Sequence, residues 1–272
     1  MNIQPIDLTR PRYASIASTA ATVISQTNWL QALNQQSHAL SLTNHRGLPV
    51  SFVEQSALPE STAYESFISE TGCVPTRNNF HDLFNALVWL SFPETKRQLN
   101  ALQAAQISRA GIGTSRGAAR DAATLFDENA ALLVVRDTPQ GARLVEALRN
   151  HQWHAAFLGQ RELFGPDAEV WLFGHALMEK LVTPYKAITA HAWAVMTPHE
   201  FHLLPHVKKR EWLDRHVANQ LALLEPDRFS TRCFTPLPVL GVPDWWPQQD
   251  QDFYSDATVF RPKITVSDNS AR

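Results

Sequence analysis

Residues 76–89, with the sequence TRNNFHDLFNALVW, constrain the fold more than any other part of this chain. From Phe80 onward, apolar residues recur at intervals of three and four, so one continuous apolar face would form on a helix. That face consists of Phe80, Leu83, Phe84, Leu87 and Val88. Asn79 is a residue type that caps helix N-termini, and Asp82 follows three positions later, as in a capping box. We therefore predict a buried helix that begins just after Asn79.

A first polar cluster lies at the start of this helix and contains Arg77, His81, Asp82 and Asn85. Polar groups beside a buried element need hydrogen bonds, ion pairs, a metal or a ligand, because unpaired burial is costly. An adjacent His–Asp pair is similar to the metal-binding dyad of some phosphohydrolases, although the further His and Asp that they need are not evident here. The alternative is that Asp82 caps the helix while His81 bonds a backbone carbonyl.

A second polar cluster contains Arg120 and Asp121. Arginine binds phosphate or carboxylate through paired hydrogen bonds, so Arg120 is a candidate for binding an anion, with Asp121 orienting it. The alternative is a plain salt bridge between these two neighbours. The nearby Asp127 and Asn129 are better explained as turn formers than as ligands.

A third polar cluster, at Gly174, His175 and Glu179, follows an apolar run. His175 and Glu179 are four residues apart, the spacing by which a helix presents two metal ligands. The glycine would let a ligand approach the backbone at the turn from strand to helix. The alternative is a His–Glu pair that bridges two elements for structural reasons.

A β-hairpin is predicted in the middle of the chain. Residues 122–126 and 131–135 are apolar runs, and the polar residues between them favour a turn. Elsewhere helix and strand patterns interleave without a regular strand–helix–strand alternation. The predicted fold class is therefore α+β, with a mixed or antiparallel sheet and packed helices.

The length of 272 residues fits one large domain, which we expect over residues 29–262. Residues 1–28 are expected to form an N-terminal arm, and residues 263–272 a flexible tail. The net charge of -2 argues against nucleic acid and anionic membranes as partners, and no apolar run reaches the ~20 residues of a membrane-spanning helix. Cys73 and Cys233 are too few for a disulfide scaffold, and no signal peptide is visible, so we expect a cytoplasmic protein.

Four stretches of the chain form a recognisable set: TRNNFHDLFNALVW, FPETK, RDAATLFDEN and FGHALMEKL. In this order they resemble a bacterial family known as domain of unknown function 3025. The resemblance runs from about Trp29 to Pro262 and implies a single soluble domain, without implying an activity. Ala130 stands where we expect glycine after the DEN turn, which bears on the type of turn but not on the hairpin.

Our leading hypothesis is a hydrolase-like enzyme that acts on a small anionic or phosphorylated substrate, assisted by a divalent metal ion if one is bound. The candidates for catalysis or metal binding are His81, Asp82, His175 and Glu179. The candidates for substrate binding are Arg77, Asn85, Arg120 and Asp121. The rival hypothesis is a non-catalytic ligand-binding or regulatory protein, because helix caps and turns explain several members of each cluster. Whether the three clusters share one pocket decides between the two hypotheses. The sequence does not define the oligomeric state.

Overall fold

The computed structural model describes residues 6–110, 117–225 and 228–263, which form an α+β domain with a four-stranded and a two-stranded sheet. The larger sheet contains both parallel and antiparallel pairs, so the predicted fold class is confirmed. Within the described residues, no helix is long and apolar enough to cross a membrane. The predicted tail lies outside the described residues from position 264 onward.

The four-stranded sheet has the strand order β4-β3-β5-β6. β3 (Ala130–Arg136) runs parallel to β5 (Thr189–Thr197) and antiparallel to β4 (Ala168–Leu172). β6 (Thr235–Pro238) is antiparallel to β5. Every residue of β3 except Arg136 is buried, because both faces of the sheet are covered by helices, as expected for a strand with a continuous apolar sequence.

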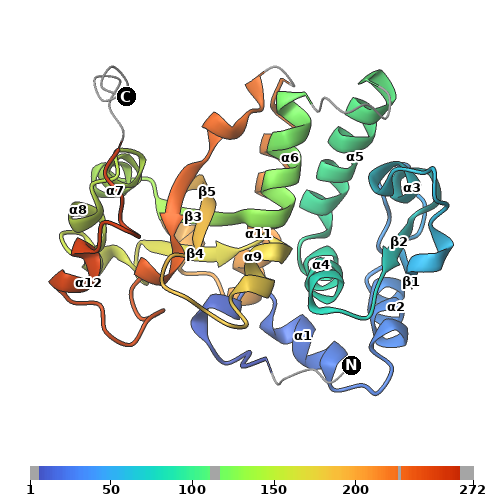
Figure 1. Cartoon of the computed structure of the whole chain (residues 1–272), viewed down its shortest axis with the longest axis horizontal. Coiled ribbons are helices and arrows are strands. Elements are labelled where there is room, and N and C mark those ends of the chain that lie inside the picture. The colour runs from blue at the N-terminus through green and yellow to red at the C-terminus, as the bar shows by residue number, and fades with distance from the viewer. Residues whose placement is uncertain (1–5, 111–116, 226–227, 264–272) are drawn as a thin grey trace.

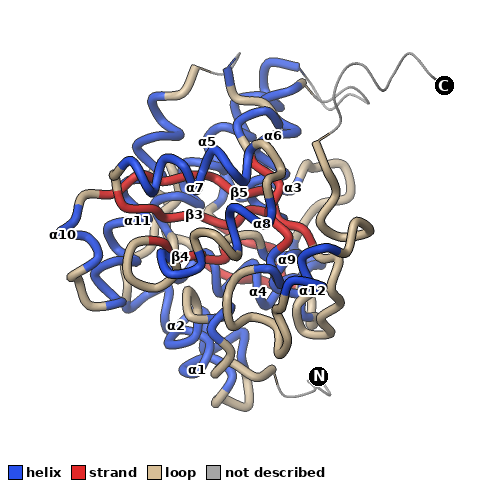
Figure 2. The backbone as a smooth tube through the Cα atoms, turned by 90° about the vertical axis from the view of Figure 1, so that its left-hand side faces the viewer, coloured by secondary structure: helices blue, strands red, loops and turns tan. Residues whose placement is uncertain are grey.

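Helices cover the two faces of this sheet unequally (Figure 1). On one side lie α7 (Pro139–Arg149), α8 (Trp153–Phe157) and α12 (Gln251–Ser255). The tube view from that side shows α7 and α8 in front of the strands (Figure 2). On the other side lie α4 (Phe80–Ser91), α5 (Pro93–Ala110), α6 (Ala118–Asn129) and α9 (His175–Lys180). The short α10 (His199–His202) leads into α11 (His206–Leu223), which packs along α5.

A smaller layer lies beyond α4 and α5 (Figure 1). It contains α2 (Trp29–Ala39), α3 (Tyr64–Thr71) and the parallel pair of β1 (Ser51–Glu54) with β2 (Cys73–Thr76). Gly72 ends α3 in the left-handed conformation, with φ of 74°, which glycine adopts more readily than other residues. This layer places α3 beside α5 and so forms one wall of the cleft described below.

The N-terminal segment contributes side chains to the hydrophobic core. Tyr13 and Ile16 are buried, as are Ala20 and Val23 of α1 (Ala17–Ile24). The hydroxyl of Tyr13 donates to the carbonyl of Met178 at 3.2 Å. The segment is therefore packed against the helices that carry the candidate site.

The helix predicted after Asn79 is confirmed as α4. The side chain of Asn79 accepts a hydrogen bond from the backbone N–H of Asp82 at 2.8 Å and so caps the helix. Leu83, Phe84 and Leu87 of the predicted apolar face are fully buried. Helical periodicity and the cap together were sufficient to locate this element.

The predicted β-hairpin is wrong in its first half. Residues 118–129 form α6, and only the second half, β3, is a strand. Ala122, Ala123 and Phe126 are buried on one side of α6, at helical rather than alternating spacing. A short apolar run has no clear period, and this one is rich in alanine, a strong helix former.

Candidate functional site

A cleft of about 500 Å³ opens where α3, α4, α5, α6 and α9 meet. It joins candidates from all three sequence clusters, namely Arg77, His81, Asp82, Asn85, Arg120 and His175. Asp121 and Glu179 do not line it. A larger cleft of about 630 Å³ between α2 and β1 has only His38 as a titratable lining residue, so the first cleft is the candidate site.

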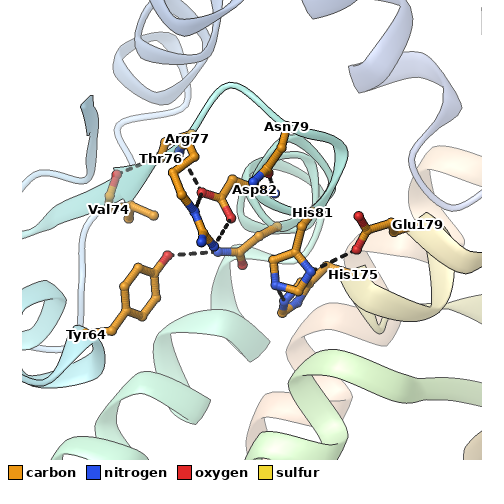
Figure 3. A network of polar contacts seen from close by, with 10 residues as sticks. Tyr64, Val74, Thr76, Arg77, Asn79, His81, Asp82, His175 and Glu179 are labelled. Atoms are coloured by element: carbon orange, nitrogen blue, oxygen red, sulfur yellow. Dashed lines mark hydrogen bonds and ion pairs between the residues drawn. The ribbon is translucent and has the colours of Figure 1, made fainter. Parts of the chain in front are cut away.

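His81 is clamped between two residues of α9 (Figure 3). Its Nδ1 lies 3.0 Å from Oε2 of Glu179, and its Nε2 lies 3.1 Å from Nε2 of His175. The two imidazole rings meet edge to face, with centroids 4.5 Å apart. His81 thus contacts the side chains of Glu179 and His175 and not a backbone carbonyl, as the alternative proposed. The spacing of four residues on α9 therefore presents two side chains to one histidine from another helix.

The hydrogen bonds define one consistent set of proton positions in this clamp. Burial lowers the pKa of His175 to about 4, so this ring is neutral near neutral pH. If Nδ1 of His81 donates to Glu179, its Nε2 accepts from Nε2–H of His175. Nδ1 of His175 then carries no proton, and it lies 3.8 Å from Oδ2 of Asp127 without a hydrogen-bond partner among the described residues. The remaining lone pair of His81 is thus directed at His175.

A buried ion pair lies behind the histidines. Nζ of Lys96 donates to Oδ1 of Asp127 at 2.6 Å and to Oδ1 of Asn85 at 2.7 Å. Nζ also lies 5.3 Å from the ring centre of Trp89. Burial acts to raise the pKa of Asp127, but Lys96 and then His175 outweigh it and hold that pKa below its ordinary range.

Sequence reasoning missed Lys96 and explained Asp127 wrongly as a turn former. Lys96 lies four residues after the buried Phe92 and three before the buried Leu99. Asp127 lies on the buried side of α6, four residues after Ala123. A charge on the apolar side of a helix is the signal that could have found both, but at Asp127 it is visible only once residues 118–129 are recognised as a helix.

Asp82 makes structural contacts, but it does not cap the helix as the alternative proposed, because Asn79 is the cap and Asp82 binds Arg77. Its Oδ2 accepts from Nε of Arg77 at 2.9 Å and from the backbone N–H of Arg77 at 2.6 Å, and its Oδ1 accepts from Nη2 at 3.1 Å (Figure 3). Asn85 is similarly occupied, because its amide nitrogen donates to the hydroxyl of Tyr64 at 2.9 Å while its oxygen binds Lys96. These contacts tie α4 to its neighbours.

The second sequence cluster is divided by the structure. Arg120 is half-buried in the cleft wall, whereas its neighbour Asp121 is exposed. Neither has a side-chain hydrogen bond or ion pair with any residue that the structure describes, so the proposed Arg120–Asp121 pairing is not formed. Arg120 is thus a cation with open hydrogen-bonding capacity in the cleft.

The four metal-ligand candidates do not come together as a metal centre. His81 and His175 meet at their Nε2 atoms, but Glu179 lies on the other nitrogen of His81 and Asp82 is engaged by Arg77. Across residues 6–110, 117–225 and 228–263, no group of three or more His, Cys, Asp or Glu side chains could hold a metal ion. The donor arrangement supplies two ligands where a stable site needs at least three.

Gly174 allows α9 to approach the backbone of α6 and β3. A Cβ atom at this position would lie 2.5 Å from the carbonyl oxygen of Glu128 and 2.6 Å from the amide nitrogen of Ala130. The close approach that the sequence suggested for a ligand is therefore made by the chain itself. The amide of Gly174 donates to the carbonyl of Ala130 at 2.8 Å.

We expect Gly174→Ala to lower the free energy of unfolding by about 1–3 kcal/mol, the range for overpacking, because backbone atoms cannot yield easily. Gly117→Ala is the matched control, since a Cβ there meets nothing within 4 Å. Urea unfolding of both variants measures the difference. Equal stabilities of the two variants would contradict the close-approach explanation.

A comparison with models of protein families matches residues 50–264 to the family described as "Protein of unknown function (DUF3025)". Searches of curated proteins and of solved structures give no match for this chain.

Proposed function

The chain belongs to the DUF3025 family of proteins of unknown function, and from its own site we propose that it is a hydrolase-like enzyme acting on a small anionic substrate. The observation that carries this proposal is His81, held by Glu179 and His175 in the wall of a cleft that also contains Arg120. An oriented imidazole beside an open cation is what acid–base catalysis on an anion requires.

In the proposed step, Nε2 of His81 takes a proton from a water molecule as the water oxygen bonds to the carbon or phosphorus of the substrate. The imidazolium keeps its Nδ1–H on Glu179 and returns the other proton to the leaving group as that bond breaks. Water must first replace the hydrogen bond from His175, which leaves a buried N–H without an acceptor at a cost of about 1–3 kcal/mol. That cost is below the ~10²- to 10⁴-fold rate gain typical of a positioned base, which corresponds to about 3–5 kcal/mol.

Arg120 and Tyr64 are the proposed donors to the substrate anion. Both line the cleft, and Arg120 offers its guanidinium group without an internal carboxylate partner among the described residues. The hydroxyl of Tyr64 accepts from Asn85, so its own hydrogen is available, and burial raises the pKa of Tyr64 so that this hydrogen is kept at neutral pH. Arg77 contributes less, because Asp82 already engages two of its nitrogens.

The composition of the chain bears on its partners and its location. The net charge of -2 supports a small molecule as the ligand, and not nucleic acid. The low cysteine content supports a reducing compartment, so we propose a cytoplasmic protein.

The rival proposal is a binding protein that holds an anion without converting it. The observation in its favour is that Asp82 and Asn85 are engaged within the protein. Both ring nitrogens of His81 also have partners, so the catalytic step needs one of these contacts to be displaced.

The test combines turnover with binding. Wild-type protein is assayed with 4-nitrophenyl phosphate and with 4-nitrophenyl esters that carry a carboxylate, and binding of inorganic phosphate is followed by calorimetry. We expect His81→Gln to lose turnover while it still binds phosphate, and Arg120→Ala to lose binding. Asp121→Ala, one residue away but outside the cleft, and Arg149→Ala, an exposed arginine on α7, are the controls. Phosphate binding without any turnover in the wild type supports the rival, and unchanged turnover in His81→Gln contradicts the enzyme proposal.

A further inference from the structure

Two side chains of opposite charge line the cleft and form no ion pair with a described residue, whereas other charged residues of the cleft are paired. Asp82 is paired with Arg77, and Asp127 with Lys96. Arg120 on α6 and Glu65 on α3 also line the cleft, but neither forms an ion pair with a described residue. They attract one another across the cleft without touching.

The carboxylate of Glu65 accepts one hydrogen bond from the described residues, and the donor is a neutral amide. Its Oε2 accepts from the amide nitrogen of Asn100 at 2.7 Å, and the same nitrogen donates to the backbone carbonyl of Glu65 at 2.9 Å. The amide oxygen of Asn100, a residue only 1% exposed, has no donor among the described residues. Burial, and then the negative charge of Asp127, raise the pKa of Glu65, although Lys96 and Arg120 act to lower it.

A donor with a positive charge would satisfy this side of the cleft. Carboxylates that are largely removed from water are usually paired, so a cleft-lining carboxylate with one neutral donor calls for a positive charge and for further N–H donors. A protonated amine or guanidinium meets both needs, because it carries the charge and the donors together. Arg120 offers the complementary charge for an anionic group of the same molecule.

We infer that the ligand of this cleft is a small zwitterion, with a phosphate or carboxylate group bound by Arg120 and a protonated nitrogen bound by Glu65. This rests on the proposed function, since both concern the same cleft. Such a substrate carries a cationic group in addition to its anionic group. Glu65, a residue outside all three sequence clusters, would select for that cationic group. The volume of about 500 Å³ is that of a site for a small molecule.

Matched probes that carry both charged groups, or only one of the two, test the inference. In the phosphate series these are 2-aminoethyl phosphate, ethyl phosphate and ethylamine, and in the carboxylate series 4-aminobutyrate, butyrate and butylamine. Calorimetric titration of the full-length protein should show, in at least one series, that the zwitterion binds about tenfold or more tightly than its anion, because a charge-assisted hydrogen bond is gained. The amine alone should bind weakly.

The variants separate the two ends of the site. Glu65→Gln should reduce binding of the zwitterion to the level of the anion, whereas Glu65→Asp keeps the charge and should retain part of the preference. Arg120→Ala should weaken zwitterion and anion alike. Glu70→Gln, an exposed glutamate on the same helix, is the control, and thermal unfolding establishes that each variant is folded.

The failures are distinguishable. If anions bind through Arg120 but the zwitterion has no advantage, the inference fails while the anion site of the proposed function stands. An advantage that survives in Glu65→Gln also overturns it, because another group then supplies the selection. If none of the six probes binds, both the inference and the proposed anion site are wrong.

Discussion

Replacing Lys96 by methionine is expected to lower the free energy of unfolding by about 3–5 kcal/mol, the usual cost of removing one partner of a buried ion pair. Lys96 is 3% exposed, and its ammonium group is the only cation paired with Asp127 in the described structure. Without Lys96, Asp127 stays buried and loses the contact that most strongly lowers its pKa against the effect of burial. Asn85 would lose the donor to its amide oxygen at the same time.

Chemical denaturation at neutral pH measures this effect. The exposed Lys208→Met on α11 is the control and should change stability by no more than about 1 kcal/mol, as for other surface pairs. The double variant Lys96→Met with Asp127→Leu should recover much of the loss, because apolar pairs of similar volume replace buried ion pairs well. A double variant as unstable as Lys96→Met alone would show that the ion pair is not the cause.

The second large effect is expected at Asp214, which lies outside the cleft. Its Oδ2 and Oδ1 accept from the backbone N–H groups of Glu94 and Thr95 at 2.9 and 2.8 Å, so α11 caps the start of α5. Burial raises the pKa of Asp214 to about 6, against the opposing effect of these hydrogen bonds. The helix start thus holds a carboxyl group whose ionisation is unfavourable.

The sign of the pH dependence follows from the raised pKa. The folded state binds a proton more tightly than the unfolded state, so the contribution to stability is complete below the ordinary value of 3.8 and is lost as pH rises through about 6. The difference corresponds to about 3 kcal/mol. Asp214→Asn cannot ionise, and it should gain up to that amount relative to the wild type between pH 4 and pH 7.5.

Urea unfolding of wild type and Asp214→Asn at several pH values measures the difference directly. Asp252→Asn, at an exposed position on α12, serves as the control and should show no comparable trend. A difference between Asp214→Asn and the wild type that stays constant with pH would mean that the backbone donors compensate the buried charge fully.

The elements with strong local signals were predictable from the sequence. The cap at Asn79 and the apolar period of α4 located that helix, and the spacing of His175 and Glu179 correctly indicated a shared helix face. The continuous apolar run of β3 also identified a strand. These features depend on residues close in the chain, for which periodicity and capping are sufficient.

The pairing of distant residues was not predictable in the same way. Nothing local indicates that His81 lies between His175 and Glu179, since the contact joins segments more than ninety residues apart. The error at residues 122–126 also hid the buried side of α6, and with it the role of Asp127. Glu65 was overlooked because it lies outside the three clusters, and its place in the cleft depends on the packing of α3 beside α5.

The contact of Gly174 with Ala130 has a consequence for how the histidine clamp can move. Because α9 is anchored to the junction of α6 and β3, His175 and Asp127 share one support, and a shift of that junction carries both residues together. His81 lies on α4, and Asn85 of the same helix is hydrogen-bonded to Lys96, the partner of Asp127. A displacement of α4 would therefore change both the 3.1 Å contact between the two histidines and the hydrogen bonds of the buried ion pair behind them.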